Sequence, residues 1–205
     1  MSEPVVSDRT LATLRELLAR EGEAIAPVLG AEPGDEVVAS LVVACARSRP
    51  DAAELALVME SILEGYLLHY GHARLLVTAD EDLRLLAGDH LYALGLSRLA
   101  QLGDLDAVRA LADLITACAR AHVRESRRAS AARVAAGLWL LSVLAVGAGR
   151  WPGYERAFAG RGDGGADGDG LIEEALRRAA ALGVEIEAKA ALIAFGRAVD
   201  DHATP

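Results

Sequence analysis

Residues 51–76 read DAAELALVMESILEGYLLHYGHARLL, a stretch in which apolar side chains recur at helical spacing. At 3.6 residues per turn, one stripe of this helix holds Leu55, Met59, Ile62, Tyr66, His69, Ala73 and Leu76. Glu60 and Glu64 fall on the opposite side. The stretch therefore predicts one long core helix over 51–76, with His69 facing the core.

Helical periodicity also dominates the rest of the chain, and no stretch alternates as a half-buried strand would. We expect helices near 8–20, 35–48, 51–76, 80–101, 104–127, 129–149, 171–182 and 185–201. Clusters of Gly, Pro and Asp separate these segments. The sequence thus predicts an all-α, single-domain helical bundle in which the four long helices from 51 to 149 share one core.

The predicted domain has three parts. A core bundle covers 34–149, a flexible Gly/Asp-rich loop covers 151–170, and a smaller helical pair covers 171–201. The chain has 205 residues, which is enough for one sizeable core. Its residues are 53% hydrophobic but only 4% aromatic, so the core must consist chiefly of Leu, Ala and Val.

Net charge limits the classes of partner. The formal charge is −9, and Lys189 is the only lysine in the chain. An acidic chain without a basic cluster has no electrostatic attraction for nucleic acid or for an anionic membrane. We therefore expect no nucleic-acid partner.

Cysteine usage and apolar runs indicate the compartment. Cys45 and Cys118 both lie in apolar helical stretches, which is typical of buried free thiols in a reducing environment. The opening residues, MSEPVVSDRT, lack the pattern of a secretion signal. The longest uncharged run, 134–149, has 16 residues, fewer than the ~20 that a membrane span needs. We expect a cytoplasmic protein with no transmembrane segment.

Two histidines in the 51–76 helix raise the question of a metal site. His69 and His72 are three residues apart, a spacing that allows two side chains on one helix face to bind the same metal ion, with His90 or Asp89 as further candidates. No carboxylate stands at a suitable spacing within the helix itself. A hydrogen-bonded core histidine is the favoured interpretation of His69, and no metal is predicted.

A second phrase suggests a family. Residues 85–102 read LLAGDHLYALGLSRLAQL, in which Leu-Ala-Gly-Asp precedes an aromatic or His residue and small apolar side chains. This phrase, with Gly88 and Asp89, resembles the helix that follows the first aspartate-rich helix of trans-isoprenyl (polyprenyl) diphosphate synthases. In that family the earlier helix has a Glu, an apolar run and a His directly before Asp-Asp-x-x-Asp, a pattern similar to residues 60–74 here.

The resemblance aligns Glu60 with that Glu and His69 with that His. Tyr70, Gly71 and Arg74 then stand where the family has its three aspartates. Those aspartates bind the Mg²⁺ that carries the allylic diphosphate, and Mg²⁺ requires oxygen ligands of the carboxylate type. A phenol, a glycine and a guanidinium do not replace them.

A third segment departs from the family in the same direction. The family opens a preceding helix with Gly-Lys-Arg, whose cations hold isopentenyl diphosphate. The corresponding phrase here, GDEVVASLVVACA at 34–46, keeps Gly34 but has Asp35 and Glu36 in place of the cations. Carboxylates at those positions would oppose a diphosphate. The second aspartate motif of the family has no counterpart.

The resemblance, which covers residues 34–149, implies a shortened helical bundle of the isoprenoid synthase type that serves as a short, catalytically silent subunit. Such a subunit would pair with an active prenyl diphosphate synthase and influence product chain length. No cofactor is expected, and Mg²⁺ would apply only if the chain were instead a diverged active prenyltransferase. The partner would be that catalytic subunit, or a second copy of this chain, bound through the apolar helices 85–102 and 104–120.

A third hypothesis has no isoprenoid role. Residues 99–114, LAQLGDLDAVRALADL, resemble part of an ankyrin unit, which would suggest a helical protein-interaction adaptor. Ankyrin arrays need about three stacked units of ~33 residues, and only one such phrase occurs. A helix that ends at Gly103, followed by one capped by Asp104, is the favoured interpretation of this phrase.

Overall fold

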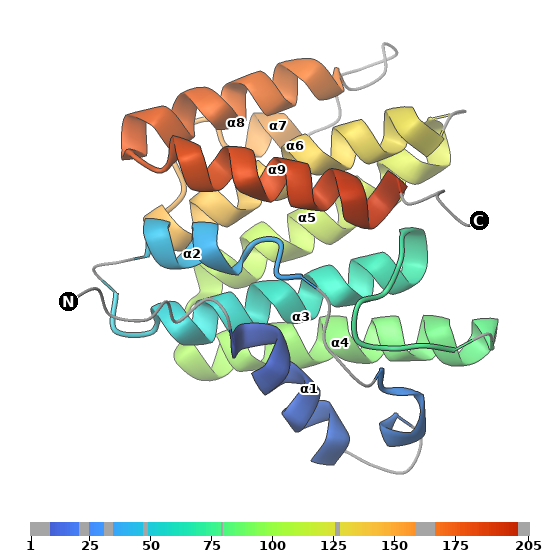
Figure 1. Ribbon diagram of the computed structural model, residues 1–205. Coiled ribbons are helices and arrows are strands. Elements are labelled where there is room, and N and C mark those ends of the chain that lie inside the picture. The colour runs from blue at the N-terminus through green and yellow to red at the C-terminus, as the bar shows by residue number, and fades with distance from the viewer. Residues whose placement is uncertain are drawn as a thin grey trace.

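The protein is an all-α, single-domain helical bundle (Figure 1). The computed structural model describes residues 9–20, 25–30, 35–46, 49–78, 80–125, 128–158 and 167–200. Within these ranges there is no β-strand, and Leu29 and Leu76 form one isolated antiparallel bridge. The predicted all-α, single-domain helical bundle is therefore confirmed.

The helices follow one another with short connections. They are α1 (Thr10–Arg20), the 3-10 turn η2 (Ala26–Val28), α2 (Ala39–Cys45), α3 (Ala52–Tyr70), α4 (Glu81–Leu102), α5 (Leu105–Arg124), α6 (Arg128–Ala148), α7 (Glu155–Phe158), α8 (Gly168–Leu182) and α9 (Glu185–Asp200).

Local chemistry explains where several of these helices begin and end. The side chains of Asp80, Asp104 and Asp167 accept backbone N–H groups at the starts of α4, α5 and α8. Gly103 and Gly183 follow α4 and α8 with φ near +74° and +72°, a conformation that glycine adopts at little cost. The predicted break at Gly103 and Asp104 is thus a glycine end followed by an aspartate cap.

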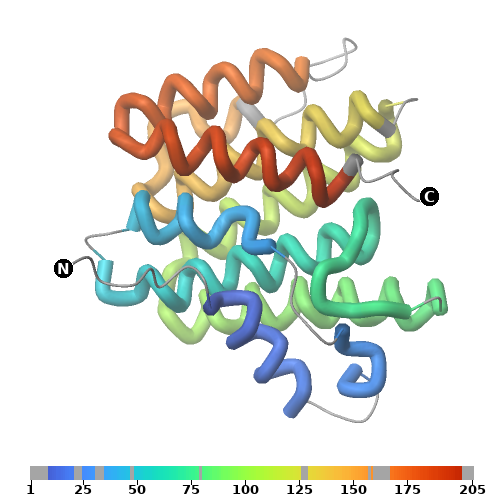
Figure 2. Tube along the Cα trace, in the orientation of Figure 1, coloured from blue at the N-terminus to red at the C-terminus, as the bar shows by residue number. Residues whose placement is uncertain are grey.

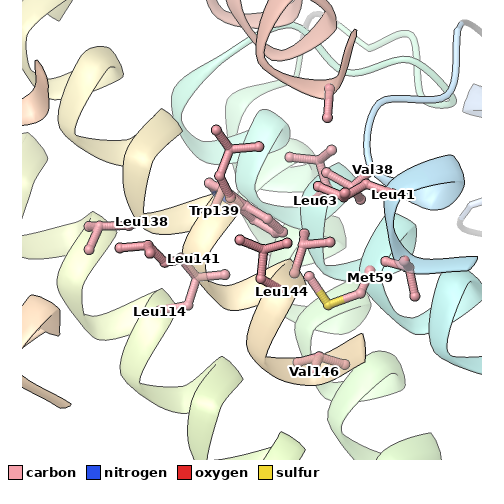
Figure 3. Close-up of a cluster of buried hydrophobic side chains, with 14 of the residues drawn as sticks. Val38, Leu41, Met59, Leu63, Leu114, Leu138, Trp139, Leu141, Leu144 and Val146 are labelled. Atoms are coloured by element: carbon pink, nitrogen blue, oxygen red, sulfur yellow. The ribbon is translucent and has the colours of Figure 1, made fainter. Parts of the chain in front are cut away.

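The main core lies between α3, α5 and α6, with α2, α8 and α9 closing it (Figure 3). Leu63 of α3, Leu114 of α5 and Leu144 of α6 all point into it, and Trp139 of α6 is one of its largest fully buried side chains. α8 and α9 run side by side and pack against α6 (Figure 2). The C-terminal helical pair therefore belongs to the same core as the central bundle.

α6 is long and apolar enough to span a membrane by composition alone. Its window Ala129–Ala148 has 20 residues, and 89% of that window is buried against the rest of the chain. The helix is thus covered by its own protein in this fold.

A smaller apolar cluster lies on the other side of α3. It joins α1 to the start of α4 and to the segment that follows α3, and contains Leu11, Leu14, Leu18, Leu57, Leu68, Leu75, Leu76, Ala87 and Leu91. Backbone hydrogen bonds from Gly30 to Leu75 and from Val77 to Val28 fasten this layer. The cluster explains why residues 71–77 fold back along the bundle.

Two helix predictions were wrong in extent. The helix predicted over 51–76 ends at Tyr70, because Gly71 interrupts it. Beyond it, the N–H of His72 donates to the carbonyl of Ala198, and those of Arg74 and Leu75 donate to the side chain of Glu64. The helix predicted over 35–48 begins only at Ala39. In the loop predicted over 151–170, α7 forms and α8 begins at Gly168; residues 159–166 lie outside the described part of the chain.

Candidate functional site

Glu60 reaches from the middle of α3 to the start of α2. Its Oε1 accepts the backbone N–H groups of Val37, Val38 and Ala39 at 3.0, 2.8 and 2.9 Å. These donors precede or open a helix and have no partner within it, so the carboxylate serves as their cap. The sequence analysis placed Glu60 opposite the apolar stripe and did not predict its burial, yet its side chain is fully buried.

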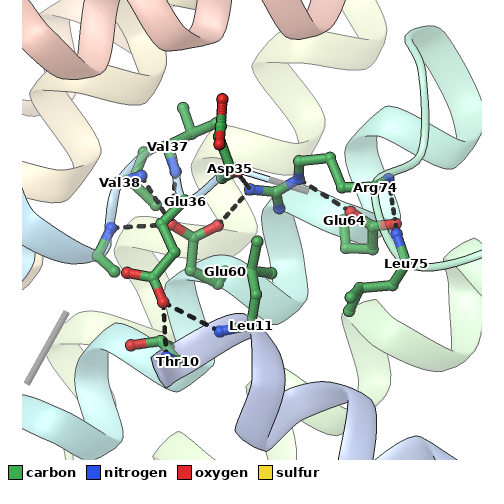
Figure 4. A network of polar contacts seen from close by, with 11 residues as sticks. Thr10, Leu11, Asp35, Glu36, Val37, Val38, Glu60, Glu64, Arg74 and Leu75 are labelled. Atoms are coloured by element: carbon green, nitrogen blue, oxygen red, sulfur yellow. Dashed lines mark hydrogen bonds and ion pairs between the residues drawn. The ribbon is translucent and has the colours of Figure 1, made fainter. Parts of the chain in front are cut away.

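Arg74 completes this network (Figure 4). Its Nη1 donates to Glu60 Oε2 at 2.7 Å and to the carbonyl of Asp35 at 3.2 Å, and its Nε donates to Glu64 Oε2 at 3.0 Å. Glu64 Oε1 accepts the N–H groups of Arg74 and Leu75, both at 2.7 Å. Glu64, like Glu60, is fully buried, although the sequence analysis placed it on the side of the helix opposite the apolar stripe.

The network balances two buried carboxylates with one guanidinium and five backbone N–H groups. Burial alone would lower the pKa of Arg74, but the charges and hydrogen bonds of Glu60 and Glu64 outweigh it and raise the pKa. Arg74 therefore stays cationic. Its Nη2 is buried with no hydrogen-bond partner among the described residues.

The acidic pair that precedes α2 is also bound internally. Glu36 Oε1 accepts the N–H groups of Thr10 and Leu11 at 2.6 and 3.1 Å, at the start of α1. Asp35 contributes its backbone carbonyl to Arg74. Gly34, which the family alignment retains, lies outside the described residues.

His69 lies where α3 crosses α4. Its Nε2 is 3.2 Å from Asp89 Oδ1, an ion-pair distance, although the alignment of the two groups does not make a hydrogen bond. The ring stacks on Tyr92, with centroids 5.4 Å apart. Gly88 permits this contact, because a Cβ there would lie 2.7 Å from His69 Nε2. The fold thus brings His69, Gly88 and Asp89 together.

Tyr70 turns toward α5. Its ring stacks on His122 with centroids 4.0 Å apart and planes 1° from parallel. His122 Nε2 in turn lies 2.9 Å from the hydroxyl of Tyr66. Burial, with the charge of Cys118 as a smaller cause, raises the pKa of Tyr70. The phenol is therefore neutral at neutral pH and is no anionic ligand.

Gly71 meets the end of α9. A Cβ there would lie 2.7 Å from Leu67 Cδ2 and 3.1 Å from the carbonyl oxygen of Ala198. The N–H of His72 donates to the same carbonyl at 3.1 Å. α9 therefore closes over the end of α3 at the position where the family alignment places the second aspartate.

Aromatic side chains occupy the space between the inward face of α3 and its neighbours. Tyr66 lies 5.7 Å from Phe195 of α9 and 5.8 Å from Trp139 of α6, measured between ring centroids. All three side chains are buried. The inner face of α3 is thus engaged by two helices of its own chain.

The residues present do not fit a Mg²⁺ site at the aligned positions. Tyr70 is stacked, Gly71 has no side chain, and Arg74 is a cation held by the two nearest carboxylates. His72 lies beyond the end of α3, so it shares no helix face with His69. Within the described ranges, no three His, Cys, Asp or Glu side chains gather as a metal site would require.

Sequence reasoning missed two participants. Glu64 follows Glu60 by one helical turn, and a repeated Glu on an otherwise apolar helix was the available signal. His122 occurs in the last turn of α5, beside the buried positions Cys118 and Ala121. Its spacing from them placed it near the core, but nothing in the sequence indicated Tyr70 as its neighbour.

No family model, no curated protein and no solved structure matches this chain.

Proposed function

We propose that this chain is a catalytically silent subunit related to polyprenyl diphosphate synthases, which pairs with an active synthase and influences product length. One observation carries the proposal: three segments that resemble successive motifs of that family meet around α3. Glu60 binds the backbone at 37–39, and His69 contacts Gly88 and Asp89. Motifs that cooperate in one site are expected to converge in this way.

The proposed lack of catalytic activity rests on the groups to which the charged side chains of this region are bound. A synthase of this family needs carboxylates for Mg²⁺ and cations for two diphosphates. Here the buried carboxylates of Glu60 and Glu64 are bound by Arg74 and by backbone N–H groups, and Glu36 caps α1. None of these groups is available to a metal ion or a substrate without dismantling a buried network, which supports a structural role for the former site.

The inner face of α3 supports the same proposal. Phe195 and Trp139 pack directly on Tyr66. A chain that elongates an isoprenoid needs space beside its reactive centre for the growing product. In a silent subunit that space has no use, and aromatic side chains that fill it add to stability.

Copurification from the native host tests the pairing. The chain carries an affinity tag at its N-terminus, and a reciprocal experiment tags the synthase encoded in the same host. We expect a synthase with both aspartate motifs, recovered in near-equal amount in each direction and absent with the tag alone. Recovery of the folded chain without any such synthase, in both directions, would contradict the proposal.

A further inference from the structure

α1 is a short helix that is held to the rest of the protein along one face. It has 11 residues, and isolated helices shorter than ~12–15 residues are only marginally stable in water. Leu11, Leu14 and Leu18 are buried in the smaller apolar cluster, against α3 and the segment that follows it. α1 therefore depends on its docking for its helical structure.

Glu36 connects the first turn of α1 to the segment that precedes α2. Its Oε1 accepts the N–H groups of Thr10 and Leu11, which lie 26 and 25 positions earlier in the chain. The positive end of the α1 dipole favours a carboxylate at this place. A cap that comes from so far along the sequence is present only when the segment that carries Glu36 is in position.

That segment is in turn held by the buried network. Residues 35–38 lie before the start of α2 and are not helical. Glu60 accepts the N–H groups of residues 37–39, and Arg74 donates to the carbonyl of Asp35. Residue 36 is thus flanked on both sides by backbone groups that the network binds, so Glu60 and Arg74 set the position of the cap.

A second series of hydrogen bonds leads from the middle of α1 to the same network. Arg15 Nε donates to the carbonyl of Gly30 at 2.9 Å. The N–H of Gly30 donates to the carbonyl of Leu75, whose own N–H donates to Glu64. Both connections from α1 therefore end at carboxylates that Arg74 binds.

We infer that α1 is a releasable cover whose docking on α3 is controlled by the network of Glu60, Glu64 and Arg74, so that helix and network are kept or lost together. Release of α1 would uncover the smaller apolar cluster, whereas the main core lies on the other side of α3. A unit of this kind can open without global unfolding. The inference goes beyond the proposed function and does not depend on it, because it requires no isoprenoid role.

Amide hydrogen exchange of the full chain tests the inference. The readout is the exchange rate of the N–H groups of Leu14, Leu17 and Leu18, which lie inside α1 and are not bonded to Glu36. Glu60→Ala removes the acceptor that holds residues 37–39, and none of the hydrogen bonds of Glu60 described above reaches α1. We expect roughly 2- to 30-fold faster exchange, the change that corresponds to the loss of a helix cap.

The decisive comparison repeats Glu60→Ala in a chain that already carries Glu36→Ala. Glu36→Ala alone should accelerate exchange in α1 to a similar degree. If Glu60 acts on α1 through residue 36, most of the effect of Glu60→Ala should disappear once Glu36 is absent. The same fold-change in both backgrounds would overturn the inference, because it would indicate a general loss of stability.

Asp167→Ala is the matched control, since it removes the cap of α8 and should leave exchange in α1 unchanged. If circular dichroism shows that Glu60→Ala does not fold, Glu60→Gln takes its place in the same comparison. It keeps an oxygen for the N–H groups but loses the charge that faces Arg74. An effect of Asp167→Ala as large as that of the Glu60 variant would contradict the inference, and so would α1 amides that are unprotected in the unmodified chain.

Discussion

Arg74 illustrates how one side chain can hold several parts of a fold. It lies on the segment after α3, yet its guanidinium binds two carboxylates of α3 and the carbonyl of Asp35 before α2. Because Glu60 and Glu64 are fully buried, they depend on this cation and on backbone donors for their charge. Loss of Arg74 would leave uncompensated negative charge in the interior.

We predict that Arg74→Met lowers the free energy of unfolding by about 3–5 kcal/mol, the usual cost of removing one partner of a buried ion pair. Urea unfolding followed by circular dichroism measures it. Arg177→Met is the control: Arg177 pairs with glutamates on the solvent-exposed face of α8, and its loss should cost no more than about 1 kcal/mol. Similar losses for the two variants would contradict this account of the network.

A second variant separates charge from packing. Glu64→Gln removes a negative charge but keeps an oxygen for the N–H groups of Arg74 and Leu75. Added to Arg74→Met, it should restore part of the lost stability. If the double variant is no more stable than Arg74→Met alone, lost packing rather than buried charge explains the effect.

Sequence reasoning at this scale identified the right residues but not their contacts. Arg74 and the acidic pair Asp35 and Glu36 were recognised as out of place for a diphosphate site. Their partners were not predictable, because α3 was expected to run to residue 76. On a continuous helix, Arg74 could not have turned back to Glu64 and Glu60. Because α3 ends at Tyr70 and the chain turns at Gly71, Arg74 reaches carboxylates that a helix continuing to residue 76 would have kept out of its range.

At the scale of elements, the crossing of α3 and α4 depends on glycine. Gly65 and Gly88 face each other, and a Cβ on Gly65 would lie 2.8 Å from the carbonyl oxygen of Gly88. Gly95 allows Ile62 a similar approach further along. The two helices are therefore closer than side chains of ordinary size permit, and His69 occupies the space that Gly88 leaves open.

We predict that Gly88→Ala destabilises the fold by roughly 1–3 kcal/mol, because its methyl group would displace the ring of His69. Gly196→Ala on α9 is the matched control. Apart from the backbone of its own helix, no atom of the described residues lies within 4 Å of a Cβ at Gly196, so alanine should stabilise that helix by about 0.5–1 kcal/mol. Thermal and urea unfolding would show the opposite signs. A stabilising Gly88→Ala would mean that the crossing is looser than described.

Elements were predicted more accurately than contacts. α4, α5 and α8 begin with aspartate caps, and α4 and α8 end at glycines, all of which are recognisable in the sequence. The end of α3 has no such cap. The N–H groups of Arg74 and Leu75, which follow it, donate instead to the side chain of Glu64 within the helix. α6 was correctly predicted to share the core, since its residues are apolar on all sides. The burial of Glu60 and Glu64 was not predicted, because carboxylates interrupt the apolar pattern of α3.

The molecule as a whole should lose stability in alkaline solution. Burial raises the pKa of Cys118 above its ordinary value of 9.0, and burial likewise raises those of Tyr92 and Tyr154 above 10.0. Groups with a raised folded-state pKa contribute stability that is complete below the unfolded pKa. That stability is lost as pH rises from the unfolded toward the folded pKa, because only the unfolded chain ionises.

We predict that the free energy of unfolding falls between pH 8 and pH 11. Cys118 alone should contribute up to about 1.4 kcal/mol per pH unit above its unfolded pKa. Cys118→Ala should show a shallower decline across this range, whatever its stability at pH 7. Urea titrations at several pH values provide the comparison. Identical slopes would show that this thiol is not shielded in the folded chain.

The central proposal is that this chain is a catalytically silent relative of prenyl diphosphate synthases that pairs with an active synthase. The most direct measurement is the chain-length distribution of the products made from isopentenyl and allylic diphosphates in the presence of Mg²⁺. It compares this chain alone, the partner synthase alone and the two proteins together. We predict no elongation by the chain alone and an altered distribution when both are present. Elongation by the chain alone above a no-protein blank, or an unchanged distribution with both, would contradict the account.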